Sequence, residues 1–154
     1  MNMTDDSAAK AGLPGLNTEK MQASQFLQLT GMRVVSAGER KAVVELAVTD
    51  KLLQGLGIMH GGMLGGLIDS AIGAAVLGEL HGKGRVVTIE YKINFYRPAR
   101  LGDLLTARAE VLHLGRATAA GEARVTDQDG NLVGHGTATF MRVTSSFAPT
   151  TSDG

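Results

Sequence analysis

The 154-residue sequence contains no cysteine, no tryptophan and only three prolines. The absence of cysteine excludes disulfide bonds, thiolate metal sites and a cysteine nucleophile. The formal net charge is zero, so the composition does not support a surface that binds polyanions such as nucleic acids. The sequence also lacks a Gly-x-Ser-x-Gly motif, which argues against a serine hydrolase with the α/β-hydrolase fold.

Apolar runs are also scarce. The opening residues, Met1 to Asp6, include no apolar segment of the kind that a secretory signal needs, and we therefore expect a cytoplasmic protein. Only residues 61–80 approach the length of a membrane span. Asp69 lies at the centre of this stretch and no charged clusters flank it, so we interpret it as a buried helix of a soluble domain rather than a membrane helix.

The length fits one domain with a hydrophobic core, which we place over residues 18–143. We expect residues 1–17 and 144–154 to be flexible, because they carry turn-forming residues without a sustained period. The hydrophobic pattern predicts helices over 18–30 and 62–80 and strands over 32–37, 41–49, 87–95, 104–114, 117–126 and 131–143. Short connections between successive strands indicate a largely antiparallel sheet wrapped around the long apolar helix, an α+β fold.

The most informative motif is His60-Gly61-Gly62 followed by Asp69. A lone carboxylate in an apolar helix costs several kcal/mol, roughly, if it is buried without a partner. Asp69 is therefore either held by Ser70, Thr88 or a backbone N–H, or it takes part in chemistry. A backbone N–H at a helix N-terminus can stabilise an oxyanion, and a carboxylate can act as nucleophile or as general base for water. Together these groups predict acyl transfer to water.

Helix geometry separates the two groups. Gly61 and Asp69 are eight residues apart, or about 12 Å along a helix, so one acyl carbon cannot contact both in the same chain. A two-fold dimer with antiparallel helices would bring Asp69 of one chain near Gly61 of the other. Glycines at 62, 66 and 73 would permit such a close approach, and they would equally permit the helix to press on its own sheet.

The chain resembles the hotdog-fold acyl-CoA thioesterases, in particular the branch of the phenylacetate-degradation (PaaI-like) and 4-hydroxybenzoyl-CoA thioesterases. The resemblance covers about residues 25–143 and rests on Gln54, His60-Gly61-Gly62, Asp69, Tyr96-Arg97-Pro98-Ala99 and Gly102-Asp103. It implies a long helix in a curved antiparallel sheet, and hydrolysis of an acyl- or aryl-CoA to the free acid and CoA without a metal or cofactor. It also implies a homodimer with shared active sites and its further pairing into a homotetramer.

The resemblance also implies roles for individual residues. Asp69 is the catalytic carboxylate, and the amide of Gly61 polarises the thioester carbonyl bound to the other subunit. Gln54 helps to hold the carbonyl or the water, and His60 orients the loop or the thioester. Thr88 can hold the attacking water in some relatives.

One position departs from the family pattern. Some relatives carry a threonine one turn after the acid, where this chain has Gly73, so placement of the water would fall more on Thr88. Regular alternation puts Thr88 on the polar face of its strand, opposite to Val87 and Ile89. Either a bulge turns Thr88 towards the helix, or the site lies on that polar face at the subunit junction.

Binding residues are expected near the dimer junction. Arginines form bidentate contacts with phosphates, although each of these arginines could equally be a solvated charge at the rim. Methionine side chains adapt to acyl groups of different shape. The residues that we expect to bind the acyl-CoA are Gly62, Met59, Met63, Phe95, Arg97, Arg100 and Arg116.

The sequence is less consistent with two other functions of this fold and with a metal site. A hotdog hydratase or dehydratase uses a different placement of Asp and His. An acyl-CoA-binding sensor would add a DNA-binding segment, for which residues 1–30 are too short and insufficiently basic. A metal site is not expected, because His81, His113 and His135 are dispersed and have no acidic residues at ligand spacing.

Overall fold

The computed structural model describes residues 18–81 and 83–143, so the segments 1–17 and 144–154 that we expected to be flexible lie outside the described residues. The predicted order of helix, two strands, long helix and four strands is confirmed, but the helix expected over 18–30 is divided at Ala23–Ser24. The elements are α1 (Thr18–Gln22), α2 (Gln25–Thr30), β1 (Arg33–Gly38), β2 (Lys41–Ala47), the short 3-10 helix η2 (Asp50–Leu52), α3 (Gly61–Glu79), β3 (Arg85–Phe95), β4 (Leu104–Leu114), β5 (Thr118–Thr126) and β6 (Leu132–Val143).

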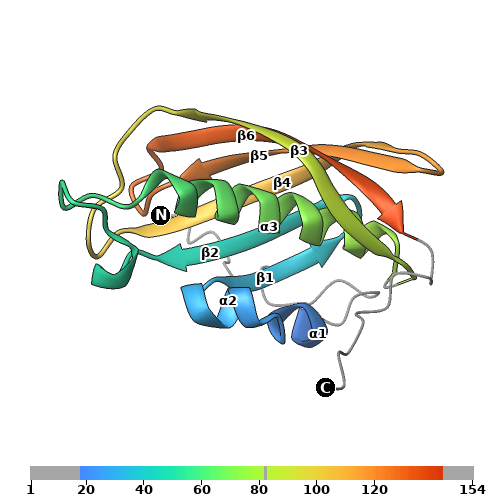
Figure 1. The fold of residues 1–154 in the computed structure, drawn as a ribbon, viewed down its shortest axis with the longest axis horizontal. Coiled ribbons are helices and arrows are strands. Elements are labelled where there is room, and N and C mark those ends of the chain that lie inside the picture. Colours follow the sequence, from blue (N-terminus) through green and yellow to red (C-terminus); the bar gives the residue numbers. More distant parts are fainter. Residues whose placement is uncertain (1–17, 82, 144–154) are drawn as a thin grey trace, which may run out of the picture.

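The six strands form one antiparallel sheet in the order β1-β2-β4-β5-β6-β3. The sheet curves around α3, which lies in its concave face (Figure 1), and every strand contacts this helix. The α+β class and the helix wrapped by a curved sheet are therefore confirmed. Strands β1 and β3 form the two edges, and β3 joins the sheet only through β6.

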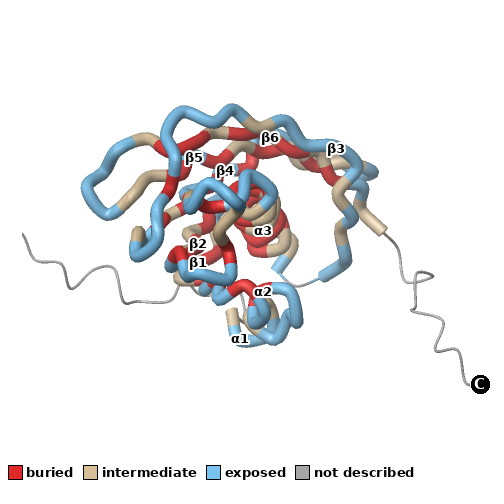
Figure 2. The backbone as a smooth tube through the Cα atoms, turned by 60° about the vertical axis from the view of Figure 1, so that its left-hand side comes forward, coloured by how far each residue is buried: buried red, intermediate tan, exposed pale blue. Residues whose placement is uncertain are grey.

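Helix α3 is the centre of the hydrophobic core (Figure 2). It is long and apolar enough to cross a membrane, but more than half of that stretch is buried inside the fold. Leu67, Ile68, Ile72 and Val76 have no exposed surface. Burying each of these side chains contributes about 1.5–3 kcal/mol, which explains why the helix is wrapped by the sheet, as predicted.

Glycines on the inner face of the sheet let α3 approach closely. A Cβ at Gly134 would lie 2.6 Å from Leu64 Cδ2, and one at Gly121 would lie 2.7 Å from Ile72 Cγ2. Both distances are too short for real carbon contacts, so any larger residue would push the helix away. These glycines fix the depth at which α3, and with it Asp69, lies in the sheet.

A β-bulge in β3 decides which way Thr88 points. Thr88 pairs with Phe140 and Glu90 pairs with Thr139, so Ile89 is an extra residue on β3. One extra residue reverses the alternation of side chains along a strand. Before the bulge, the even-numbered residue Thr88 therefore faces α3. After the bulge, the odd-numbered residues, beginning with Tyr91, face α3. Of the two alternatives left by the sequence, the bulge is confirmed.

The short helices α1 and α2 lie beside the other edge of the sheet (Figure 1). The side-chain amide of Gln22 donates from Nε2 to the carbonyl of Met32 (2.8 Å), and its Oε1 accepts the N–H of Val34 (2.9 Å). The amide therefore pairs with β1 as a neighbouring strand would. This contact, together with the buried side chain of Leu27, fixes the two helices against the core.

Candidate active site

His60 caps the N-terminus of α3. The side-chain Nδ1 of His60 accepts the backbone N–H of Gly62 at 2.9 Å, and the backbone N–H of His60 donates to the carbonyl of Leu52 at 2.8 Å. Gly61 is the first residue of the helix, where an N–H has no carbonyl partner in the preceding turn. No hydrogen bond from this N–H forms within residues 18–81 and 83–143. The helix therefore presents one open donor, reinforced by the positive end of its dipole.

Gln54 lies in the loop before the helix, half-buried. Its Oε1 accepts the N–H of Leu56 at 2.7 Å, and its backbone N–H donates to Ile58 at 2.8 Å. The side-chain carbonyl of Gln54 is thus used to shape its own loop. The Nε2 group remains as the donor through which Gln54 can contact a carbonyl oxygen.

Asp69 and Thr88 form the second part of the site. The Thr88 hydroxyl on β3 donates a hydrogen bond to Asp69 Oδ1 on α3 at 2.8 Å. Burial raises the pKa of Asp69 above its usual 3.8, and the hydrogen bond from Thr88 partly offsets this increase. A carboxylate with a raised pKa is a stronger base than a solvated one, which suits general-base catalysis.

A hollow of about 620 Å³ opens beside this pair, a size typical of small-molecule sites. Asp69 and Thr88 lie in its wall. It runs between α1–α2 on one side and β3 on the other, along α3. Its apolar lining comes from Met21, Phe26, Leu27, Val34, Leu77, Val86 and Phe140.

The expected acyl-binding residues lie elsewhere. Met59 is buried in the core, with 7% of its surface exposed, and Met63 packs against the core. Phe95 is 59% exposed and its ring lies beside Gly61, since a Cβ at Gly61 would lie 3.3 Å from Phe95 Cε1. None of these three lines the hollow beside Asp69. They surround the helix N-terminus instead.

Gly61 and Asp69 are not brought together within one chain, because α3 is continuous between them. Two half-sites result: the open N–H near Phe95, and the Asp69–Thr88 pair beside the hollow. Large side chains between them remain half-exposed, at 53% for Tyr91 and 47% for Phe26. Two exposed aromatic side chains therefore lie beside α3 between the two half-sites.

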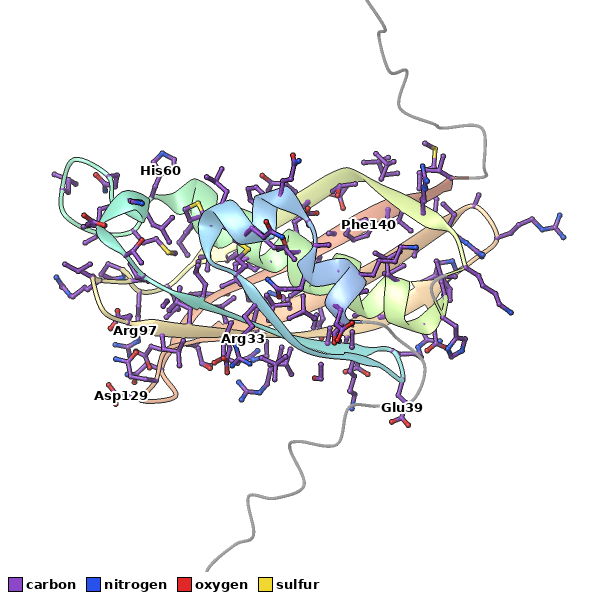
Figure 3. The ribbon with its side chains drawn as sticks, turned by 90° about the horizontal axis from the view of Figure 1, so that it is seen from below. Arg33, Glu39, His60, Arg97, Asp129 and Phe140 are labelled. Carbon is purple, nitrogen blue, oxygen red and sulfur yellow. The ribbon has the colours of Figure 1, made fainter. Side chains whose placement is uncertain are left out.

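The three arginines expected to bind CoA do not share one location. Figure 3 shows Arg97 at the same end of the molecule as His60, and Arg100 joins that end through its bridge to Ile58. Arg116 follows the last residue of β4, whereas Arg97 and Arg100 precede its first residue. An eleven-residue strand is about 36 Å long. Arg116 therefore cannot contact the same phosphate as the other two in one chain.

Within the described ranges 18–81 and 83–143, no group of three or more His, Cys, Asp or Glu side chains gathers as a metal site would require. The His135 Nε2–Glu122 Oε2 contact of 3.0 Å is a pair on the sheet, without a third ligand. The groups available for chemistry are thus the Asp69 carboxylate, the Thr88 hydroxyl, the Gly61 N–H and the Gln54 amide.

A model of the Thioesterase superfamily matches residues 56–134, which include both half-sites. The chain belongs to this superfamily. It is 33% identical over 103 residues to a 1,4-dihydroxy-2-naphthoyl-CoA hydrolase of Listeria monocytogenes, covering 67% of this chain and 83% of the relative. It is 36% identical over 98 residues to the acyl-coenzyme A thioesterase PaaI of Escherichia coli, covering 64% and 68%.

Solved structures agree with this assignment. The conserved protein PA5202 of Pseudomonas aeruginosa superposes with a TM-score of 0.78 at 34% identity, covering 82% of this chain and all of that one. The E. coli PaaI protein superposes with a TM-score of 0.75 at 29% identity, covering 82% and 89%. The thioesterase superfamily member described here thus has the hotdog fold and is a thioester hydrolase, and both expectations from the sequence are confirmed.

Sequence reasoning missed the contribution of α1 and α2 to the hollow. Met21 and Leu27 are apolar positions of a segment read as a helix, so the sequence indicated that this segment packs against something. It carried no signal for the hollow, because Leu27 and Asp69, which line it from opposite elements, are 42 positions apart.

Proposed function

We propose that this thioesterase is an acyl-CoA hydrolase that works as a homodimer, with Asp69 and Thr88 from one subunit and the Gly61 N–H from its partner at each site. The observation that carries the proposal is the Thr88–Asp69 hydrogen bond beside a hollow, with the open N–H of Gly61 about two turns away at the start of the same helix. The relatives named above as hydrolases of acyl-CoA thioesters support CoA as the leaving group.

The Thr88 hydroxyl occupies Asp69 Oδ1 and leaves Oδ2 for the reacting molecule. As a general base, Oδ2 takes a proton from water while the water oxygen bonds to the thioester carbon. The oxyanion then collapses, the C–S bond breaks, and the CoA thiolate recovers the proton from Asp69. As a nucleophile, Oδ2 itself bonds to the carbonyl carbon and expels the thiolate, and water hydrolyses the resulting anhydride. In both routes the Gly61 N–H stabilises the oxyanion.

The edge of the sheet supports the dimer. Strand β3 has eleven residues and a free edge, and Ile89, Tyr91 and Phe95 on it are more than half exposed. Antiparallel pairing of β3 with a second copy, about an axis near its middle, places the first half of one strand beside the second half of the other. Thr88 then lies beside the second half of the partner subunit's β3, which ends at Phe95, and in each subunit the Phe95 ring lies beside Gly61.

Mixing two inactive variants tests this arrangement. Asp69→Asn removes the carboxylate, and Gly61→Pro removes the N–H. Proline is well accepted as the first residue of a helix, and the ψ of 133° at His60 suits a residue before proline. Gly61→Ala, which keeps the N–H, is the matched control, since the half-exposed Phe95 ring can move aside.

Each variant alone should hydrolyse acyl-CoA at least about 100-fold more slowly than the parent. Dimers reassembled from an equal mixture should regain about a quarter of the parent activity, because half of them carry one intact site of two. Thiol release measures the rate. Complementation failure would place the whole site within one chain, and full activity of Asp69→Asn would refute the carboxylate role. Tight binding of acyl-CoA without thiol release would instead favour a sensor, and hydration of an enoyl-CoA would favour a hydratase.

A further inference from the structure

The hollow beside Asp69 extends along α3 towards the C-terminus of the helix. On α3 it is lined by Asp69, Gly73 and Leu77, which follow each other at one-turn spacing towards the C-terminus of the helix. From Asp69 to Leu77 the helix rises by about 12 Å. The hollow therefore begins at the carboxylate and extends away from the helix N-terminus.

The walls of the hollow are mostly apolar, and Lys20 and Ser24 are the polar residues on the helical side. Helices α1 and α2 form one side through Met21, Phe26 and Leu27, and Val86 and Phe140 lie on the sheet side (Figure 3 labels Phe140). The Phe26 ring also lies against Gly66, since a Cβ there would be 3.0 Å from Phe26 Cζ, and so it closes the hollow one turn before Asp69. The Gln22 amide fixes the helical wall to β1.

Gly73 sets the width of the hollow. It lies one turn beyond Asp69, and the lack of a side chain leaves open the space between α3 and Phe140 on the sheet side. A Cβ at this position would lie 3.6 Å from Phe140 Cε1, an ordinary contact. The fold thus accepts a methyl group at this buried position, and packing does not require glycine.

Resting on the proposed acyl-CoA hydrolysis, we infer that this hollow holds the acyl chain of the substrate, that Gly73 determines which chains can enter beyond the first few carbons, and that Leu77 determines the length accepted. With C–C bonds of about 1.52 Å in a zigzag, 12 Å accommodates roughly eight to ten carbons. The preferred substrate class is therefore the medium-chain aliphatic acyl-CoA thioesters. Apart from the Asp69–Thr88 pair, the polar residues of the lining are Ser70 on α3 and Lys20 and Ser24 on the helical side. The rest of the lining is apolar, which favours an aliphatic acyl chain.

Chain-length profiles test the inference. The parent, Gly73→Ala, Gly73→Val and Leu77→Ala are compared on acetyl-, hexanoyl-, octanoyl- and dodecanoyl-CoA. Each methylene excluded from an apolar site costs about fourfold in kcat/KM. Gly73→Val should lower the ratio of kcat/KM for octanoyl-CoA over acetyl-CoA at least about tenfold, and Gly73→Ala should lower it less. Leu77→Ala should raise the ratio for dodecanoyl-CoA over octanoyl-CoA.

Leu112→Ala is the matched control for Leu77→Ala, because Leu112 is an exposed leucine on β4 and does not line the hollow. It should leave both ratios unchanged. Gly73→Ala guards against misfolding of the valine variant, since alanine favours a helix over glycine, and its melting temperature should be no lower than that of the parent.

The inference is overturned if the Gly73 variants slow all chain lengths equally or leave the profile unmoved. If the parent hydrolyses acyl-CoA in a manner that depends on Asp69 while the profile does not respond, this inference fails and the proposed function stands. If the parent shows no Asp69-dependent hydrolysis of any acyl-CoA, both fail together.

Discussion

Removing the Thr88 hydroxyl gives the sharpest test of the Asp69 site. Thr88→Val keeps the size and the β-branched shape of the side chain but removes the donor that contacts Asp69 Oδ1 at 2.8 Å. Hydrogen bonds to charged groups contribute about 1.5–3 kcal/mol, and we take the lower end because Asp69 is only partly buried. At pH values where Asp69 is fully ionised, kcat/KM should therefore fall about tenfold.

The pH profile of the same variant separates positioning from general damage. The hydrogen bond lowers the pKa of Asp69 against the effect of burial, so its loss should raise this pKa and move the acidic limb of kcat/KM to higher pH. Thr88→Ser, which keeps a hydroxyl, should restore the position of the limb. A limb that stays in place or moves to lower pH in Thr88→Val would refute the assignment.

A matched control exists between β6 and β3, on the outer face of the sheet. The Thr139 hydroxyl donates to Glu90 Oε1 at 3.0 Å on the exposed side of the sheet. Thr139→Val removes a threonine–carboxylate hydrogen bond of the same kind outside the hollow. It should leave both the rate and the acidic limb unchanged, as measured by thiol release from octanoyl-CoA between pH 4 and 9, roughly the range in which carboxylates and histidines titrate.

Three further outcomes are expected. Asp69→Asn should melt at a higher temperature than the parent at neutral pH, because burial raises the folded-state pKa of Asp69 and the parent loses stability as the pH rises from 3.8 through that pKa. Calorimetry should show that the difference in melting temperature becomes smaller in acid, and an unchanged difference would contradict this expectation. His60→Ala should lower the free energy of unfolding by about 1 kcal/mol in urea titrations, and His60→Ser should recover it, because serine also caps the N–H of Gly62. Removing Arg97 and Arg100 together should raise KM for acyl-CoA about fivefold, as expected for two exposed ion pairs, but not for a thioester that lacks the nucleotide; equal effects on both would argue against phosphate contacts.

The sequence predicted the elements well because each has a strong period. The alternation in 87–95 and the apolar length of 62–80 needed no knowledge of distant contacts. The orientation of the Thr88 side chain could not be predicted from the local sequence alone. The bulge residue, Ile89, is a strand-forming isoleucine rather than glycine, so nothing local marks it, and only pairing with Thr139 and Phe140 on β6 reveals it.

The hollow was harder to foresee for the same reason. It depends on α1 and α2 lying against β1, and on the position of α3 set by glycines of β5 and β6. The split of the expected 18–30 helix at Ser24, which makes these helices two short pieces, also has no strong local cause, since the Ser24 side chain makes no capping hydrogen bond. Among the acyl-binding candidates that were chosen by residue type, Met59 is buried in the core, whereas Phe95 is exposed beside Gly61.

The Gln22 amide has a consequence for assembly. A β-sheet with two free edges can add a copy at each one and grow into a filament. Here the carbonyl of Met32 and the N–H of Val34 are already taken by Gln22, and α1 and α2 lie beside that edge. This leaves β3 as the edge open to a second copy, and in the proposed dimer a symmetric pair would use that edge on both chains at once. The Gln22 amide of α1, by occupying β1, would then stop edge-to-edge association of the sheet at two chains.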